Sequence, residues 1–181
     1  MNAQTKNQLP FYEIPAAPEN YSSGNVVTRM IDGLGYRYYW ASDSLKESDL
    51  AFQPSESGKS CLETIQHIYD LSVTIKNVAN SAANVRKNSK NEMSYEEMRK
   101  KTLENLFEAR SSFLNKTDAE IEPLKVIFQN GENKSEFPFW NFINGPLSDA
   151  IYHTGQIVVF RRASGHPISS NVRVFTGVNA K

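Results

Sequence analysis

Cysteine is nearly absent from this sequence: Cys61 is the only one in 181 residues. A single cysteine cannot form a disulfide within the chain, so a small secreted scaffold held by disulfides is excluded. No run of about 18 apolar residues occurs, and we therefore expect no membrane-spanning helix. The first twenty residues also lack the continuous apolar segment of a secretory signal. These absences predict a soluble protein of a reducing compartment, and we expect a cytoplasmic location.

The sequence also lacks a surplus of charge of either sign, since 20 basic residues balance 20 acidic residues. A protein that binds nucleic acid usually carries a basic surplus on one face. A basic surplus also attracts proteins to anionic membranes. We therefore expect neither nucleic acid nor a membrane among the partners.

The length is typical of one domain with short tails. Residues 1–22 contain three prolines and few periodic apolar positions, which indicates an extended or partly disordered arm. Residues 23–168 hold the periodic segments and are expected to form the domain. Residues 169–181 are expected to form an extended tail.

Four segments have the apolar spacing of amphipathic helices. The first begins near Gly24, and the second and third open with the capping-box pairs Ser60/Glu63 and Ser94/Glu97. The apolar positions that define the first three stripes include Ile31, Leu34, Ile65, Ile68, Ile75, Leu103, Leu106 and Phe113.

The fourth helix is expected to run from near Phe139 to Ser164, with Ile157 in its apolar stripe. Pro146 interrupts its early part and predicts a kink or a later start. Gly165 fits the left-handed position that follows a helix end.

Between Lys125 and Phe139 the apolar residues no longer recur with helical spacing. Here β-branched and aromatic residues flank the pair Asn130-Gly131. This pattern favours a short hairpin, and an irregular loop is the alternative. The sequence therefore predicts an all-α four-helix bundle with a short hairpin or extended excursion between the third and fourth helices.

The last helix carries polar residues on or beside its apolar face. Asp149 and His153 are four residues apart, so their side chains lie one above the other. Gln156 lies at the edge of the same face, and His67 borders the apolar arc of the second helix. A buried carboxylate is costly without a partner, so Asp149 needs a hydrogen bond, an ion pair or a metal.

These residues resemble a known family. The segments "LAFQPSESGKSCLETIQHI" and "DAIYHTGQIVVFRRASGHP", with roughly eighty residues between His67 and the second segment, are similar to the DinB-like (YfiT-like) superfamily of metal-dependent four-helix-bundle proteins. The resemblance covers about residues 24–168. It implies that His67 and His153 are two of three imidazoles that hold a divalent metal, commonly nickel or zinc.

The sequence departs from the family at Asp149, where the family has a histidine. Two imidazoles and one carboxylate form a known facial metal site, and zinc also accepts this ligand set. The change favours harder ions such as iron or manganese. The alternative is a branch that has lost the metal, in which Asp149 hydrogen-bonds to His67 or His153.

The resemblance implies a metal-dependent enzyme that acts on a small molecule, either as a transferase using a low-molecular-weight thiol or as a hydrolase. It also implies a homodimer. The alternative is a non-catalytic, dimeric, stress-related helical bundle with a degenerate metal site, in which the polar cluster gives structural specificity.

For the other residues that could take part in binding or catalysis, we expect structural roles. We expect Glu63 to act as a helix cap, Cys61 to be a buried and inert thiol, and His166 to be a loop residue. Arg161 and Arg162 are expected to be solvated or to complement a helix dipole, with anion binding near the metal site by one of them as the alternative. Both tryptophans, including Trp140, are expected to line the core or a pocket.

Overall fold

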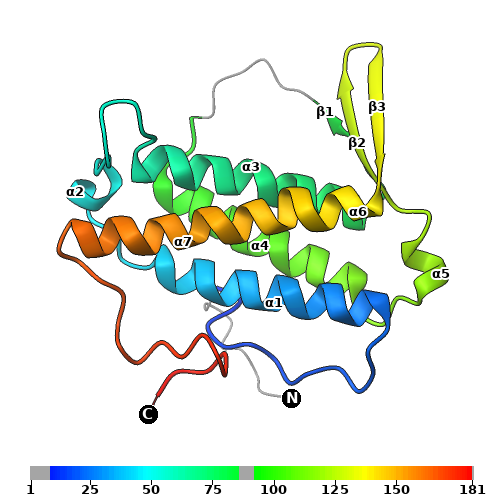
Figure 1. Ribbon diagram of the computed structural model, residues 1–181, viewed down its shortest axis with the longest axis horizontal. Coiled ribbons are helices and arrows are strands. Elements are labelled where there is room, and N and C mark those ends of the chain that lie inside the picture. Colours follow the sequence, from blue (N-terminus) through cyan, green and yellow to red (C-terminus); the bar gives the residue numbers. More distant parts are fainter. Residues whose placement is uncertain (1–8, 86–91, 181) are drawn as a thin grey trace.

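The computed structural model describes residues 9–85 and 92–180. Within these ranges the chain is mostly helical, with a small three-stranded sheet. Long helices lie side by side, and a β-hairpin projects beyond them (Figure 1). The long helices in the described ranges are α1 (Ser23–Ala41), α3 (Cys61–Ala79), α4 (Tyr95–Phe113) and α7 (Ser148–Ala163). The expected helical class therefore holds for most of the described chain.

The starts of α1, α3 and α4 are fixed by serine caps. Ser22 accepts a hydrogen bond from the first turn of α1. At α3, Ser60 Oγ accepts from the Glu63 N–H at 3.2 Å and the Glu63 carboxylate accepts from the Ser60 N–H at 2.7 Å. Ser94 and Glu97 repeat the arrangement at α4. Both predicted capping boxes are confirmed, and each serine cap contributes about 1 kcal/mol of helix stability.

Each long helix buries an apolar stripe against two others. Helix α1 packs on α4 and α7, and α3 also packs on α4 and α7. Fully burying one large aliphatic side chain contributes about 1.5–3 kcal/mol, so these stripes hold the helices together. The predicted stripe positions that are fully buried are Ile31, Leu34, Ile65, Ile68, Ile75, Leu103, Leu106, Phe113 and Ile157.

The predicted hairpin is confirmed, and the alternative of an irregular loop is wrong. Strand β2 (Lys125–Asn130) pairs antiparallel with β3 (Asn133–Pro138), and Gly131 in the turn has a φ of +58°. Strand β1 (Asn84–Val85) adds to β2 in parallel, which gives the sheet order β1-β2-β3. The sequence did not predict β1, because a two-residue strand has no detectable period.

The expected kink near Pro146 is present. A short helix α6 (Phe139–Phe142) leads into a π-helical turn, η1 (Ile143–Leu147), and then into α7. Proline has no N–H to donate, so a regular α-helical ladder cannot continue through this point. Beyond α7, Gly165 has a φ of +82°, as expected of a residue that follows a helix end.

The described part of the N-terminal arm packs on the helices. Phe11 is only 2% exposed and lies over Gly35, where an added Cβ would come within 2.5 Å of the phenyl ring. The Ile14 N–H donates to the Gly177 carbonyl at 2.8 Å, which joins the arm to the C-terminal tail. The tail is not simply extended, since Gly177 has a φ of +72° in a turn. Residues 1–8 and Lys181 lie outside the described ranges.

Two short helices, α2 (Glu47–Leu50) and α5 (Asp118–Ile121), lie in the loops between long helices. Trp40 lines a pocket, as expected, but Trp140 is 78% exposed, so the expectation that it lines the core or a pocket is wrong. No helix within the described ranges combines the length and apolar character needed to cross a bilayer.

Candidate metal centre

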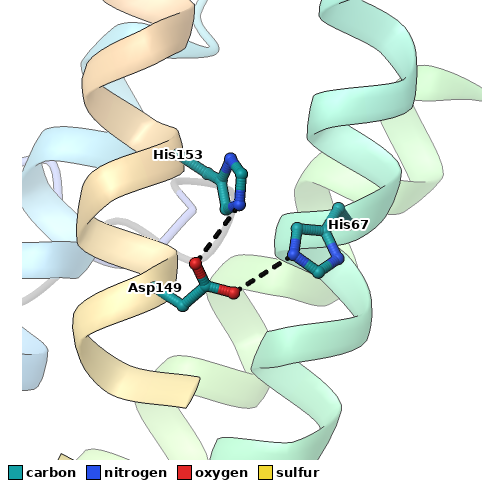
Figure 2. A group of neighbouring side chains, drawn as sticks. All are labelled: His67, Asp149 and His153. Atoms are coloured by element: carbon teal, nitrogen blue, oxygen red, sulfur yellow. Dashed lines mark hydrogen bonds and ion pairs between the residues drawn. The ribbon is translucent and has the colours of Figure 1, made fainter. Parts of the chain in front are cut away.

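The structure brings together the three residues that the sequence singled out. His67 projects from the middle of α3, whereas Asp149 and His153 project from successive turns of α7 (Figure 2). Since α3 and α7 pack directly against each other, the three side chains converge at their contact. One potential ligand atom from each residue lies within 4.8 Å of the others.

Asp149 lies between the two imidazoles. Its Oδ2 is 3.2 Å from His67 Nε2, and its Oδ1 is 3.3 Å from His153 Nε2. The imidazole rings are nearly perpendicular, with centroids 4.6 Å apart. Figure 2 shows both Nε2 atoms directed at the carboxylate. The carboxylate therefore contacts a histidine through each of its oxygens.

Gln156 orients His153 from the opposite side of the ring. Its Oε1 lies 2.7 Å from His153 Nδ1, and an amide oxygen only accepts hydrogen bonds. Nδ1 therefore carries the proton, which leaves the Nε2 of a neutral imidazole as a lone pair aimed at Asp149. Two acceptors facing each other at this distance need a cation or an additional proton between them.

The donor set is one that divalent metals accept. Zinc–nitrogen bonds of about 2.0–2.1 Å in a tetrahedral site place adjacent ligand atoms about 3.4 Å apart. The two contacts of Asp149, at 3.2 and 3.3 Å, are close to this separation but use different carboxylate oxygens, and the one donor atom that each residue offers lies within 4.8 Å of the other two. The side chains of His67, Asp149 and His153 are 31%, 41% and 16% exposed, so small molecules can reach the group from solvent.

Other predicted residues have the structural roles expected of them. Glu63 caps α3, and Cys61 is fully buried. Burial raises the pKa of the Cys61 thiol to about 11, with a further contribution from the Asp49 carboxylate. A thiol of this kind is protonated at neutral pH and is inert.

His166 is not a simple loop residue, which corrects the expectation. Its Nδ1 lies 2.6 Å from Oδ2 of Asp49, which is 2% exposed. Burial alone would raise the pKa of Asp49, but hydrogen bonds from Ser164, the Lys46 N–H and His166 outweigh it and lower this pKa to about 2. The sequence did not predict this group, because Asp49 is in a short loop helix without apolar periodicity.

A buried ion pair between α1 and α4 was also not predicted. Arg110 Nε donates to Asp32 Oδ1 at 2.8 Å, and Asp32 is fully buried. Burial raises the pKa of the Asp32 carboxyl, and Arg110 opposes that shift. The sequence places Asp32 and Arg110 in two different helices. Their pairing could not be predicted, because it depends on how α1 and α4 pack against each other.

No family model, curated protein sequence or solved structure matches this chain. The resemblance to DinB-like proteins accordingly depends on two short segments and on the polar residues within them.

Proposed function

We propose that His67, Asp149 and His153 bind one divalent metal ion within a DinB-like four-helix bundle. The observation that carries this proposal is the convergence of His67 with Asp149, 82 positions further along the chain, and with its i,i+4 neighbour His153. The lone pair of His153 that faces the Asp149 carboxylate supports it further, because a bound cation would satisfy both groups.

The ligand set narrows the choice of metal. Two imidazoles and one carboxylate suit iron, manganese or zinc, and nickel is the remaining candidate from the family resemblance. A metal held by three protein ligands supplies a Lewis acid that activates a coordinated thiol or water. The partial exposure of Asp149 leaves an approach for a small substrate.

The proposed activity is that of a metal-dependent enzyme acting on a small molecule. Transfer involving a low-molecular-weight thiol and hydrolysis are the two reaction classes. Within either class, Gln156 holds the His153 ring, and α3 and α7 hold the donors in register. The proposal also includes a homodimer, which the family resemblance implies. It includes a cytoplasmic location, because a single cysteine is typical of a protein from a reducing compartment.

Metal analysis tests the proposal directly. The full chain is purified without a histidine tag, and its metal content is measured by inductively coupled plasma mass spectrometry before and after incubation with zinc, nickel, manganese and ferrous iron. We expect about one metal per chain in the wild type, and a loss of at least about tenfold in affinity in both Asp149→Ala and His153→Ala.

The rival function is that of a non-catalytic bundle in which the same residues form a polar network. The two contacts of Asp149 have lengths that such a network would also show. If no metal binds under any loading condition, and replacing all three residues with apolar ones raises the melting temperature, the metal-dependent function is wrong. Glu63→Gln serves as a matched control, since Glu63 is on α3 but caps the helix.

A further inference from the structure

A second polar site lies away from the candidate metal centre, at the C-terminal ends of α1 and α7. It is a pocket with a volume of about 280 Å³. Its apolar walls include Trp40, Pro167 and Ile168. Its polar lining consists of Arg161, His166, Asp43 and the serines Ser44 and Ser169. The pocket therefore combines an aromatic wall with two nitrogen-rich side chains and one carboxylate.

Arg161 is a buried cation without a carboxylate partner. It is only 5% exposed, and within the described ranges no acidic oxygen lies within 4.0 Å of its guanidinium group. Its Nη1 donates to the carbonyl groups of Trp40, Ala41 and Asp43, and its Nε donates to the His166 carbonyl. These bonds complement the C-terminal end of α1, but they provide only partial negative charge.

The two nearby carboxylates are already engaged. Asp43 Oδ1 accepts a hydrogen bond from Arg99 at 3.1 Å. Asp49 accepts from Ser164 at 2.6 Å and contacts His166 Nδ1 at 2.6 Å. The positive charge of Arg161 is therefore not neutralised by either neighbour, and its Nη2 donates to no residue in the described part of the chain.

His166 lines the pocket and uses only one of its two ring nitrogens in contacts within the described ranges. Because a carboxylate only accepts hydrogen bonds, Asp49 holds the proton of His166 on Nδ1. Nε2 has no partner within the described ranges, and the side chain is 29% exposed. When the imidazole is protonated, Nε2–H becomes a charged donor whose charge is stabilised by Asp49.

We propose that this pocket binds a small organic carboxylate, held by Arg161 and by the protonated His166 and packed against Trp40. A carboxylate offers two acceptor oxygens to the two donors, and the apolar walls favour an organic body over a bare inorganic anion. This site is independent of the proposed metal centre. The charged and titratable groups in or next to the pocket, within the described ranges, include Asp43, Asp49, Cys61, Arg99, Arg161 and His166.

The experiment uses sodium benzoate as the probe and benzamide as its uncharged analogue. Binding to the full chain is followed by the indole N–H resonance of Trp40 and the ring resonances of His166 in NMR spectra. Trp140→Phe assigns the Trp40 signal, since Trp140 is the other tryptophan and is largely exposed. We expect benzoate at about pH 5.5 to move both sets of resonances and to bind at least about tenfold more tightly than benzamide.

His166→Gln is the decisive variant, because glutamine can keep a hydrogen bond to Asp49 but cannot carry a charge. We expect it to weaken benzoate binding at about pH 5.5 by about tenfold or more. Arg161→Lys should also weaken benzoate binding. If the Arg161→Lys variant does not fold, the result for His166→Gln alone tests the site. Benzamide should bind weakly to the wild type and to both variants.

The metal ligands provide the control that separates the two proposals. His67→Gln should abolish metal binding and leave benzoate binding unchanged. The carboxylate site is wrong if benzoate moves neither set of resonances at concentrations up to tens of millimolar, or if wild type and His166→Gln bind it equally. Either result leaves the metal analysis unaffected.

Discussion

Asp149 occupies the position on which the candidate chemistry depends. Each of its oxygens faces the Nε2 of a different histidine, at 3.2 and 3.3 Å. A histidine in its place would present a single ring nitrogen to the group. The carboxylate adds a negative charge that a neutral imidazole lacks, which favours binding of a divalent cation and the harder metals in particular.

Gln156 should control the metal affinity without binding the metal. Gln156→Leu removes the acceptor for His153 Nδ1–H, which frees the imidazole to place its proton on Nε2. We expect zinc affinity to fall by about 10–100-fold. Isothermal titration calorimetry at neutral pH measures the change. Gln156→Glu keeps an acceptor and should retain the affinity, and equal affinities in Gln156→Leu and wild type would contradict the orienting role.

Asp49 should contribute to stability in a pH-dependent way. Its folded-state pKa of about 2 is below the ordinary value of 3.8, so the ionised carboxylate stabilises the fold above about pH 4. This stabilisation is lost as the pH falls towards 2. Asp49→Asn should therefore be less stable than wild type at neutral pH. The difference in stability between the two proteins should become smaller between about pH 4 and pH 2.

Thermal unfolding followed by circular dichroism measures this gap. Asp70→Asn is the control, because Asp70 is exposed on α3 and its carboxylate accepts a hydrogen bond from the neutral Gln66. If the gap between Asp49→Asn and wild type stays constant down to about pH 2, the proposed pairing of Asp49 does not stabilise the fold.

At the scale of elements, helix α1 has a contact surface for the N-terminal arm at Gly35. Gly35 leaves room for the Phe11 ring, which is buried against the helix. The structure shows that the group approaching Gly35 is an aromatic side chain of the N-terminal arm.

Two glycine substitutions should therefore have different effects. Gly35→Ala places a methyl group 2.5 Å from the Phe11 ring and should destabilise the protein by about 1–3 kcal/mol. Gly155→Ala meets nothing within 4 Å in the middle of α7 and should stabilise it by up to about 1 kcal/mol. Urea unfolding measures both changes. If Gly35→Ala is as stable as wild type, Phe11 does not pack there in solution.

At the scale of the whole molecule, metal binding should be linked to folding. The donors come from α3 and α7, so only the folded chain assembles them. At about 1,000 times the dissociation constant, zinc should stabilise the fold by about 4 kcal/mol. For a chain of this length that raises the melting temperature by roughly 8–16 °C.

Differential scanning calorimetry with and without a chelator checks this linkage. The chelator should reverse the shift in the wild type, and Asp149→Ala should show little shift with any metal. If the metal raises the melting temperature of Asp149→Ala as much as that of the wild type, the metal binds elsewhere.

The sequence by itself determined the features whose causes are local. The apolar residues of the long helices recur every three or four positions, so burial of Ile65 or Leu103 follows from spacing within one helix. Serine caps and the turn at Gly131 likewise depend on hydrogen bonds and backbone angles within a few residues. The i,i+4 pair Asp149 and His153 belongs to this class.

Only the tertiary structure decided which distant residues meet. His67 reaches Asp149 across 82 positions, a meeting that the family resemblance implied but that no spacing in the sequence required, and His166 reaches Asp49 across 117. Phe11 enters the core from a proline-containing arm whose sequence has no period. The cost of closing a loop changes slowly with its length, so separation along the chain does not identify the partner. Helix packing does, because it fixes which faces, and therefore which polar side chains, lie opposite each other.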